Sequence, residues 1–192
     1  MPAGRRSSAT SNMGAEARQV VGFWREAGEA GQWFIKDAAF DRRFRERFLD
    51  LHLAAARREL DAWAESADSA LALLLLLDQY PRNAFRHTPH MYATDVLARQ
   101  FARQAIARGH AAQVDAALRP FFCLPFAHSE DLPDQELSVT LNAQLGPEAR
   151  RHAEGHRDIV RRFGRFPHRN AILGRESTAA EAAFLHQGGF AG

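Results

Sequence analysis

The chain has 192 residues, of which 46% are hydrophobic and 25% charged, so it can bury a substantial core, and this composition excludes a disordered or fibrous protein. Its formal net charge of +2 gives no overall field that would attract nucleic acid, and its single cysteine, Cys123, excludes a disulfide scaffold. The longest apolar run has eight residues, 70–77, whereas a membrane-spanning helix needs about 20. Because no signal peptide opens the sequence either, we expect a soluble, cytoplasmic protein that binds neither nucleic acid nor membranes.

The first residues show no periodicity, and the pattern then becomes helical. Residues 1–14 are small and polar, which predicts a disordered lead-in and leaves open whether translation starts at Met1 or Met13. Phe40, Phe44 and Phe48 recur every four residues, which predicts one buried face of a helix.

A leucine-rich helix follows, apolar on every side and therefore expected at the centre of the domain. Asp68 or Ser69 can cap its start, and we expect it to stop at Tyr80, because a proline disfavours helix at the residue before it. Thr94 is expected to cap the next helix, which ends at Gly109.

Three more helices are predicted in the second half of the chain. The first opens at residues 131–133 and closes at Gly146, the second runs from Pro147 to Gly164, and the third begins with a capping box of Thr178 and Glu181. The sequence thus predicts an all-α fold, with one helical domain of about seven or eight helices over residues 15–187 and a flexible tail over 188–192.

Polar residues that helix faces do not explain lie in short loops after apolar helices. Arginine offers a planar fork of donors and asparagine both a donor and an acceptor, which suits a carboxylate or a phosphate. The predicted ligand-binding residues are Arg82, Asn83, Arg165, His168, Arg169, Asn170 and Arg175. The alternative is that Arg82 and Arg169 tie their loops to helix C-terminal carbonyls, or pair with Asp78 and Glu130.

Two of these loops resemble each other. Residues 80–86, Tyr-Pro-Arg-Asn-Ala-Phe-Arg, and residues 166–172, Phe-Pro-His-Arg-Asn-Ala-Ile, share an aromatic-Pro start and an Arg-Asn-Ala continuation. An internal duplication and a chance likeness of short strings explain this equally well.

Three residues are candidates for acid-base chemistry: Asp78, His128 and Glu130. Asp78 directly follows eight apolar residues, so its carboxylate is expected to be buried and to need a partner; a salt bridge is favoured over a role as general base. His128, Glu130, His156 and His168 could instead serve a metal-dependent hydrolase, although a buried core role for His156 is favoured. We expect no metal site, and the sequence identifies no cofactor.

Three motifs occur in the chain in this order: Leu76-Leu77-Asp78-Gln79-Tyr80-Pro81-Arg82-Asn83, Pro125-Phe126-Ala127-His128-Ser129-Glu130-Asp131 and Phe163-Gly164-Arg165-Phe166-Pro167-His168-Arg169-Asn170. With them, the chain resembles bacterial domain-of-unknown-function family 924 over about residues 20–186. Tyr80 and Ala127 depart slightly from its pattern. The resemblance implies an all-helical fold grouped with tetratricopeptide-like superfamilies and supplies no reaction.

The sequence leaves three functional hypotheses, and whether the protein is an enzyme stays open. The favoured one is a pocket for a small anionic ligand, phosphate or carboxylate, lined by arginine, asparagine and histidine. The second is a non-catalytic protein-interaction module of tetratricopeptide-like shape with an aromatic groove at Phe23, Trp24, Trp33 and Phe34. The third is the metal-dependent hydrolase.

Overall fold

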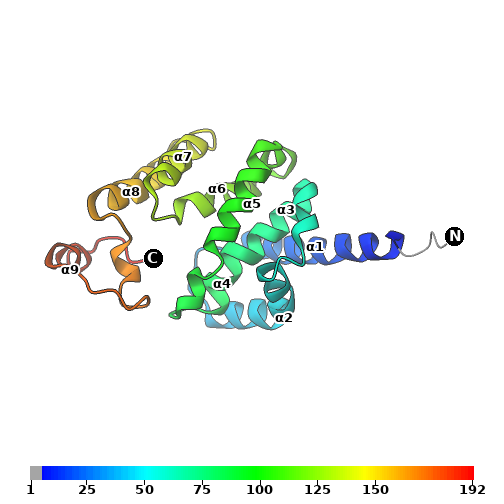
Figure 1. The fold of residues 1–192 in the computed structure, drawn as a ribbon, viewed down its shortest axis with the longest axis horizontal. Coiled ribbons are helices and arrows are strands. Elements are labelled where there is room, and N and C mark those ends of the chain that lie inside the picture. Colours follow the sequence, from blue (N-terminus) through cyan, green and yellow to red (C-terminus); the bar gives the residue numbers. More distant parts are fainter. Residues whose placement is uncertain (1–5) are drawn as a thin grey trace. The chain divides into compact units, whose positions relative to one another are not determined.

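The structure, a computed structural model, describes residues 6–192, with side chains from residue 14. Over this range every regular element is a helix and there is no strand, so the predicted all-helical fold is confirmed (Figure 1). The α-helices are α1 (Arg6–Glu29), α2 (Ala38–Ala56), α3 (Ala67–Leu74), α4 (Tyr80–Ala84), α5 (Asp95–Ala107), α6 (Pro120–Ala127), α7 (Leu132–Ala143), α8 (Pro147–Phe163) and α9 (Ala179–His186). Short 3₁₀ turns and one π-helical turn stand between them.

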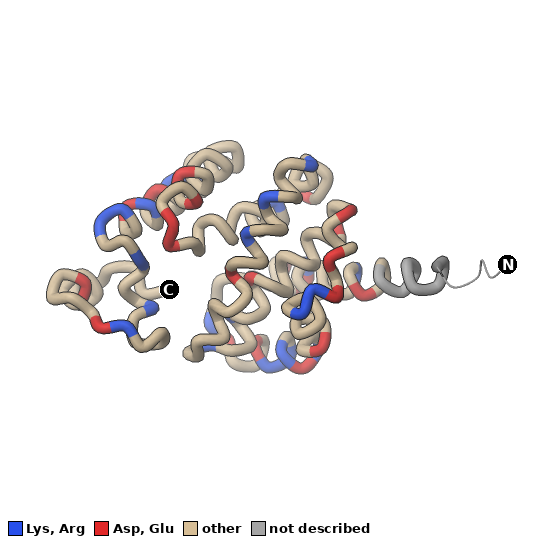
Figure 2. The backbone as a smooth tube through the Cα atoms, in the orientation of Figure 1, with Lys and Arg blue, Asp and Glu red and all other residues tan. Residues whose placement is uncertain are grey.

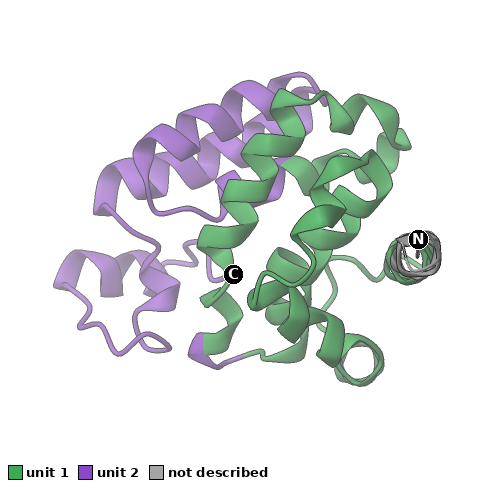
Figure 3. Cartoon of the chain, turned by 45° about the vertical axis from the view of Figure 1, so that its right-hand side comes forward, with its two compact units in different colours: residues 1–86, 90–122 green, residues 87–89, 123–192 purple. Residues whose placement is uncertain are grey.

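The chain forms two compact units (Figure 3). Unit 1 comprises residues 1–86 and 90–122, and unit 2 comprises residues 87–89 and 123–192. The boundary at residues 122 and 123 falls inside α6. The ten residues predicted to form a site are therefore divided, with Asp78, Arg82 and Asn83 in unit 1 and the others in unit 2.

The core of unit 1 forms around the leucine-rich segment, as its apolar character predicts. All residues from Ala70 to Leu77 are at most 3% exposed. The predicted stripe of α2 is buried too, because Phe40, Phe44 and Phe48 lie inward, each at most 1% exposed. Aromatic rings of α1 pack on this stripe, with the ring of Phe23 5.2 Å from that of Phe44.

The leucine-rich helix does not stop at Tyr80, and this corrects the prediction. α3 passes into a π-helical turn over Leu75–Gln79 and continues directly as α4, with Pro81 in its first turn. Pro81 has no N–H to donate to the preceding turn. Side chains satisfy carbonyls there instead: His52 Nδ1 lies 2.9 Å from the oxygen of Leu76, and Thr94 Oγ1 donates to that of Leu77.

This arrangement also revises the predicted helix caps. Thr94 stands before α5 as expected, but its hydroxyl donates to Leu77 and caps nothing. Ser66, rather than Asp68 or Ser69, precedes α3. The Thr94 hydroxyl thus satisfies a carbonyl of the π-helical turn instead of capping its own helix, so a tertiary hydrogen bond overrides the local capping preference of threonine.

In unit 2, α7 and α8 form an antiparallel pair and lie side by side (Figure 1). Gly146 separates them, and Gly164 ends α8 with φ +70°, the left-handed conformation that favours glycine. The predicted capping box at the start of α9 is present, because Thr178 accepts from the backbone of Glu181 and the Glu181 side chain accepts from that of Thr178.

Two predictions concern the ends of the chain. Of the predicted lead-in, residues 1–5 lie outside the described residues, and α1 starts at Arg6 rather than near Ala15. Within the predicted tail, Phe190 packs its ring against the imidazole of His156, 4.7 Å between ring centres.

Both signs of charge occur throughout the described part of the chain. Figure 2 shows basic and acidic residues interspersed along both units. A search of the described residues for a helix long and apolar enough to span a membrane finds none.

Candidate functional site

The unit 1 candidates Asp78 and Arg82 bind each other. The Arg82 guanidinium lies 3.1 Å from the Asp78 carboxylate and donates two hydrogen bonds to Asp95, at 2.8 and 3.0 Å. Burial alone would lower the pKa of Arg82, but these two carboxylates raise it above its usual value. Asp78 is 1% exposed, so its charge is balanced by the salt bridge that the sequence favoured.

Asn83 also serves packing between helices. Its side-chain amide donates to Asp41 of α2 at 2.8 Å, and Arg86 makes a two-pronged ion pair with the same carboxylate. These bonds fix α4 against α2. Asn83 therefore has a structural partner at the position where the sequence suggested a ligand.

A histidine pair in unit 1 escaped the sequence reasoning. The Nε2 atoms of His52 and His90 lie 2.9 Å apart. Because His52 donates from Nδ1 to the Leu76 carbonyl, its Nε2 accepts, and His90 is the donor. Burial lowers the pKa of both imidazoles. The one sign of this arrangement in the sequence was Pro81, which has no N–H, so that a carbonyl of the preceding turn needs a donor from elsewhere, here His52.

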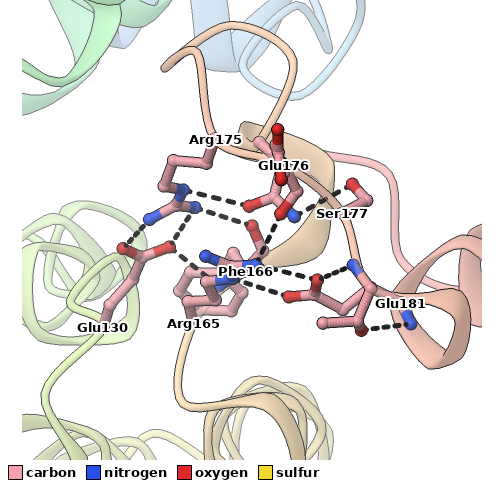
Figure 4. Close-up of polar contacts among 9 residues, drawn as sticks. Glu130, Arg165, Phe166, Arg175, Glu176, Ser177 and Glu181 are labelled. Carbon is pink, nitrogen blue, oxygen red and sulfur yellow. Dashed lines mark hydrogen bonds and ion pairs between the residues drawn. The ribbon is translucent and has the colours of Figure 1, made fainter.

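In unit 2, Glu130 joins two segments far apart in the sequence (Figure 4). It accepts from the Arg175 guanidinium at 2.7 and 2.9 Å and from the backbone N–H of Phe166 at 2.8 Å. Burial opposes its ionisation, but the hydrogen bonds from Arg175 and Phe166 hold its pKa below the usual value. Glu130 and Arg175 are thus occupied with each other.

Arg165 is bound in the same way. It donates to both carboxylate oxygens of Glu181, at 2.6 and 2.9 Å, and to the carbonyl of Glu176 (Figure 4). These hydrogen bonds lower the pKa of Glu181 to about 2. Asn170 accepts from Arg175 and donates to Ser177, so it closes the loop that follows the 3₁₀ turn at Pro167–Arg169.

The remaining candidates gather into one group, which we call the histidine–arginine cluster: His128, His156, His168 and Arg169. The guanidinium of Arg169 lies 4.7 Å over the ring of Phe166, and its Nη2 donates to the carbonyl of His128. The imidazoles of His156 and His168 contact the same Phe166 ring, at 5.7 and 5.6 Å between ring centres.

Two imidazoles of the cluster, those of His156 and His168, are neutral at pH 7. Burial, followed by the neighbouring His128, His152 and Arg169, lowers the pKa of His156 to about 4. Burial, followed chiefly by Arg169, lowers the pKa of His168 to about 3, although Glu130 opposes this shift. The Nδ1 atom of His168 is buried and has no hydrogen-bond partner in the described part of the chain. A polar atom in this state is costly unless something binds it.

The geometry does not favour the hydrolase. Among the described residues, no group of three or more histidine, cysteine, aspartate or glutamate side chains is arranged to hold a metal ion. Glu130, a proposed ligand, is bound by Arg175. Cys123 is buried, and burial raises the pKa of its thiol to about 12, so it is not a nucleophile at neutral pH.

Of the four residues of the predicted aromatic groove, Trp24 is buried in the core, Phe23 and Trp33 are half-buried and Phe34 is exposed. Trp24 is fully buried, and Phe23 stacks on the rings of α2. Phe34 remains 74% exposed and Ile35 58% exposed.

A shallow hollow of about 410 Å³ lies elsewhere in unit 2. Its lining residues are Arg162, Phe163, Arg165, Thr178, Ala180 and Glu181. Of the two arginines that line it, Arg165 is paired with Glu181.

Comparisons with known proteins agree with this fold. The structure of Protein of Unknown Function ATU0120 from Agrobacterium tumefaciens is similar, with 58% sequence identity and a TM-score of 0.88, over 91% of this chain and 99% of that one. No curated protein matches the chain. The model of the family described as "Bacterial protein of unknown function (DUF924)" matches residues 20–189. The chain therefore belongs to the DUF924 family.

Proposed function

We propose that unit 2 binds a small anionic ligand, a phosphate or a carboxylate, at the histidine–arginine cluster. The observation that carries the proposal is the pair of sheltered imidazoles, His156 and His168, beside the guanidinium of Arg169. Both imidazoles are neutral at pH 7 because burial and neighbouring positive charge oppose protonation. An anion placed among them reverses that balance, since it attracts a proton to an imidazole and accepts hydrogen bonds from it.

The ion pairs narrow the original list of ligand-binding residues. Arg82, Arg165 and Arg175 neutralise buried or half-buried carboxylates, so an anion would have to compete with an existing partner for each of them. His168 has no such partner, and its Nδ1 is available to donate once the ring is protonated. We therefore assign ligand binding to His168, with Arg169, His128 and His156 as its neighbours in the cluster, and a structural role to Arg82, Arg165 and Arg175.

The test is a thermal melt of the purified protein with phosphate, sugar phosphates, nucleotides and dicarboxylates in turn. A ligand that binds only the folded state, at a hundred times its dissociation constant, adds about 2.7 kcal/mol and raises Tm by several degrees. We expect one class of anion to raise Tm, and His168→Gln to abolish the increase.

The matched control is His186→Gln, which changes an exposed histidine at the end of α9. It should keep the full increase. Circular dichroism establishes that each variant is folded, and His156→Gln replaces His168→Gln if the latter is not. Absence of any increase across the panel, or an increase that both cluster variants retain, would overturn the proposal.

A further inference from the structure

The histidine–arginine cluster has an aromatic neighbour that the sequence did not single out. Phe190 directs its ring edge-on to His156 and to His168, at 4.7 and 5.1 Å between ring centres, with interplanar angles of 83° and 84°. The ring of Phe166 lies 6.4 Å away, so Phe190 completes an enclosure made otherwise of two imidazoles and one phenyl ring.

Phe190 is more exposed than the Phe166 ring that contacts the same histidines. It is 42% exposed, whereas Phe166, on the same histidines, is 1% exposed. It follows two glycines beyond the end of α9, and Gly188 has φ +82°. Glycines at such positions allow a segment to change direction at little steric cost. Both features would allow the ring to leave the cluster.

The space that the ring fills adjoins polar groups. His168 contacts both Phe190 and Phe166, while the guanidinium of Arg169 lies over the other ring of this enclosure. A molecule that replaced Phe190 would contact two imidazole rings and a phenyl ring. An anionic group attached to it would lie beside the ring of His168, whose Nδ1 has no hydrogen-bond partner in the described part of the chain, and Arg169 follows His168 in the chain and lies over the ring of Phe166.

We propose that the ligand of this site is an aromatic anion, a planar ring bearing a phosphate or carboxylate, and that Phe190 occupies the place of the ring when no ligand is bound. This inference rests on the proposed function and adds the class of ligand to it. Edge-to-face contacts between rings favour such a replacement, because the ligand's ring would make the same contacts as Phe190. Phe190 then acts as an internal competitor, which lowers the apparent affinity of the ligand.

Calorimetry with two matched pairs of probes tests this proposal: inorganic phosphate with phenyl phosphate, and acetate with benzoate. The protein is compared with Phe190→Ala. We expect the ring-bearing member of one pair to bind Phe190→Ala about tenfold more tightly than it binds the unaltered chain, because the competitor is gone. The affinity for the member without a ring should change by less than about twofold.

A second variant removes the competitor by another route. A Cβ at Gly189 would lie 2.6 Å from the ring and from the carbonyl oxygen of Phe184, so Gly189→Ala should displace the segment that carries Phe190. It should reproduce the gain seen with Phe190→Ala. Phe34→Ala, which removes an exposed ring in unit 1, is the matched control and should leave all four affinities unchanged.

The outcomes separate the two proposals. If an anion without a ring binds but ring-bearing probes gain nothing in Phe190→Ala and Gly189→Ala, the inference fails and the anion site stands. If ring-bearing probes bind more weakly in both variants, Phe190 is part of the binding wall and the inference also fails. If no probe binds any form of the protein, the anion site itself is wrong.

Discussion

At the scale of single residues, Glu130, a candidate for acid-base chemistry in the sequence, forms an ion pair in the fold. It holds Arg175 and the backbone of Phe166 through hydrogen bonds of 2.7–2.9 Å. We expect Glu130→Gln to reduce the free energy of unfolding by about 1–3 kcal/mol, because it leaves a half-buried guanidinium without its counter-charge. Urea denaturation measures this loss.

The control for that experiment is an ion pair of the same chemistry on the surface. Asp115, 66% exposed in its side chain, binds Arg25, 49% exposed, at 2.6 Å. Asp115→Asn should change stability by less than about 0.5 kcal/mol, since exposed pairs contribute little. Equal losses for the two variants would show that Glu130 does not hold the loop network together.

The two sheltered imidazoles predict a dependence of stability on pH. In the unfolded chain histidine titrates near pH 6.5, whereas the native pKa values of His156 and His168 are about 4 and about 3. The unfolded state therefore binds more protons below pH 6.5. Their contribution to stability is complete above that pH and declines as the pH falls toward the native values, by at most about 1.4 kcal/mol per pH unit for each histidine.

Urea denaturation between pH 7 and pH 5 measures this dependence. The double variant His156→Gln and His168→Gln should lose less stability over this range than the unaltered chain. If the free energy of unfolding changed with pH equally in the double variant and the unaltered chain, the native imidazoles would titrate like those of the unfolded chain, contrary to their buried environment.

At the scale of elements, α8 contains one glycine that the fold does not need and ends at one that it does. Gly155 lies in the helix interior with open space where a Cβ would stand, whereas Gly164 has φ +70°. We expect Gly155→Ala to stabilise the protein by about 0.5–1 kcal/mol and Gly164→Ala to destabilise it by about 1 kcal/mol. Thermal melts of both variants check the signs, and a stabilising Gly164→Ala would contradict this account of how α8 ends.

The elements also show what the sequence could and could not predict. Periodicity and capping chemistry act locally, so the buried stripe of α2 and the capping box of Thr178 were predictable from neighbouring residues alone. The π-helical turn at Leu75–Gln79 was not predictable in this way. Donors from the distant residues His52 and Thr94 satisfy carbonyls of the turn and so allow the helix to continue past Pro81.

For the candidate site, too, local signals were predictable from the sequence and contacts between distant residues were not. Residue types and loop positions indicated His168 and Arg169, which do lie in one cluster with His128 and His156. The sequence could not show that Arg82, Arg165 and Arg175 form ion pairs, since the carboxylate that neutralises an arginine is known only once the chain is folded. Phe190 was missed because a ring in a glycine-rich segment carries no periodic signal.

At the scale of the whole molecule, the two units share the continuous helix α6, and the three tryptophans, Trp24, Trp33 and Trp63, all belong to unit 1. A helix across the boundary loses backbone hydrogen bonds if either side unfolds. We therefore expect tryptophan fluorescence, which follows unit 1, and far-UV circular dichroism, which follows both units, to give the same Tm within about 1 °C. Transitions several degrees apart would show that the units unfold independently.

The central claim, that an anion binds among His156, His168 and Arg169, is tested most directly by NMR of the histidine side chains during a titration with the anion that raises Tm. At pH 7 we predict that the imidazole signals of His156 or His168 move toward those of the protonated ring as the anion is added, while those of exposed His186 stay in place. Unchanged signals from both cluster histidines at saturation, with Tm still raised, would place the anion elsewhere and contradict the account.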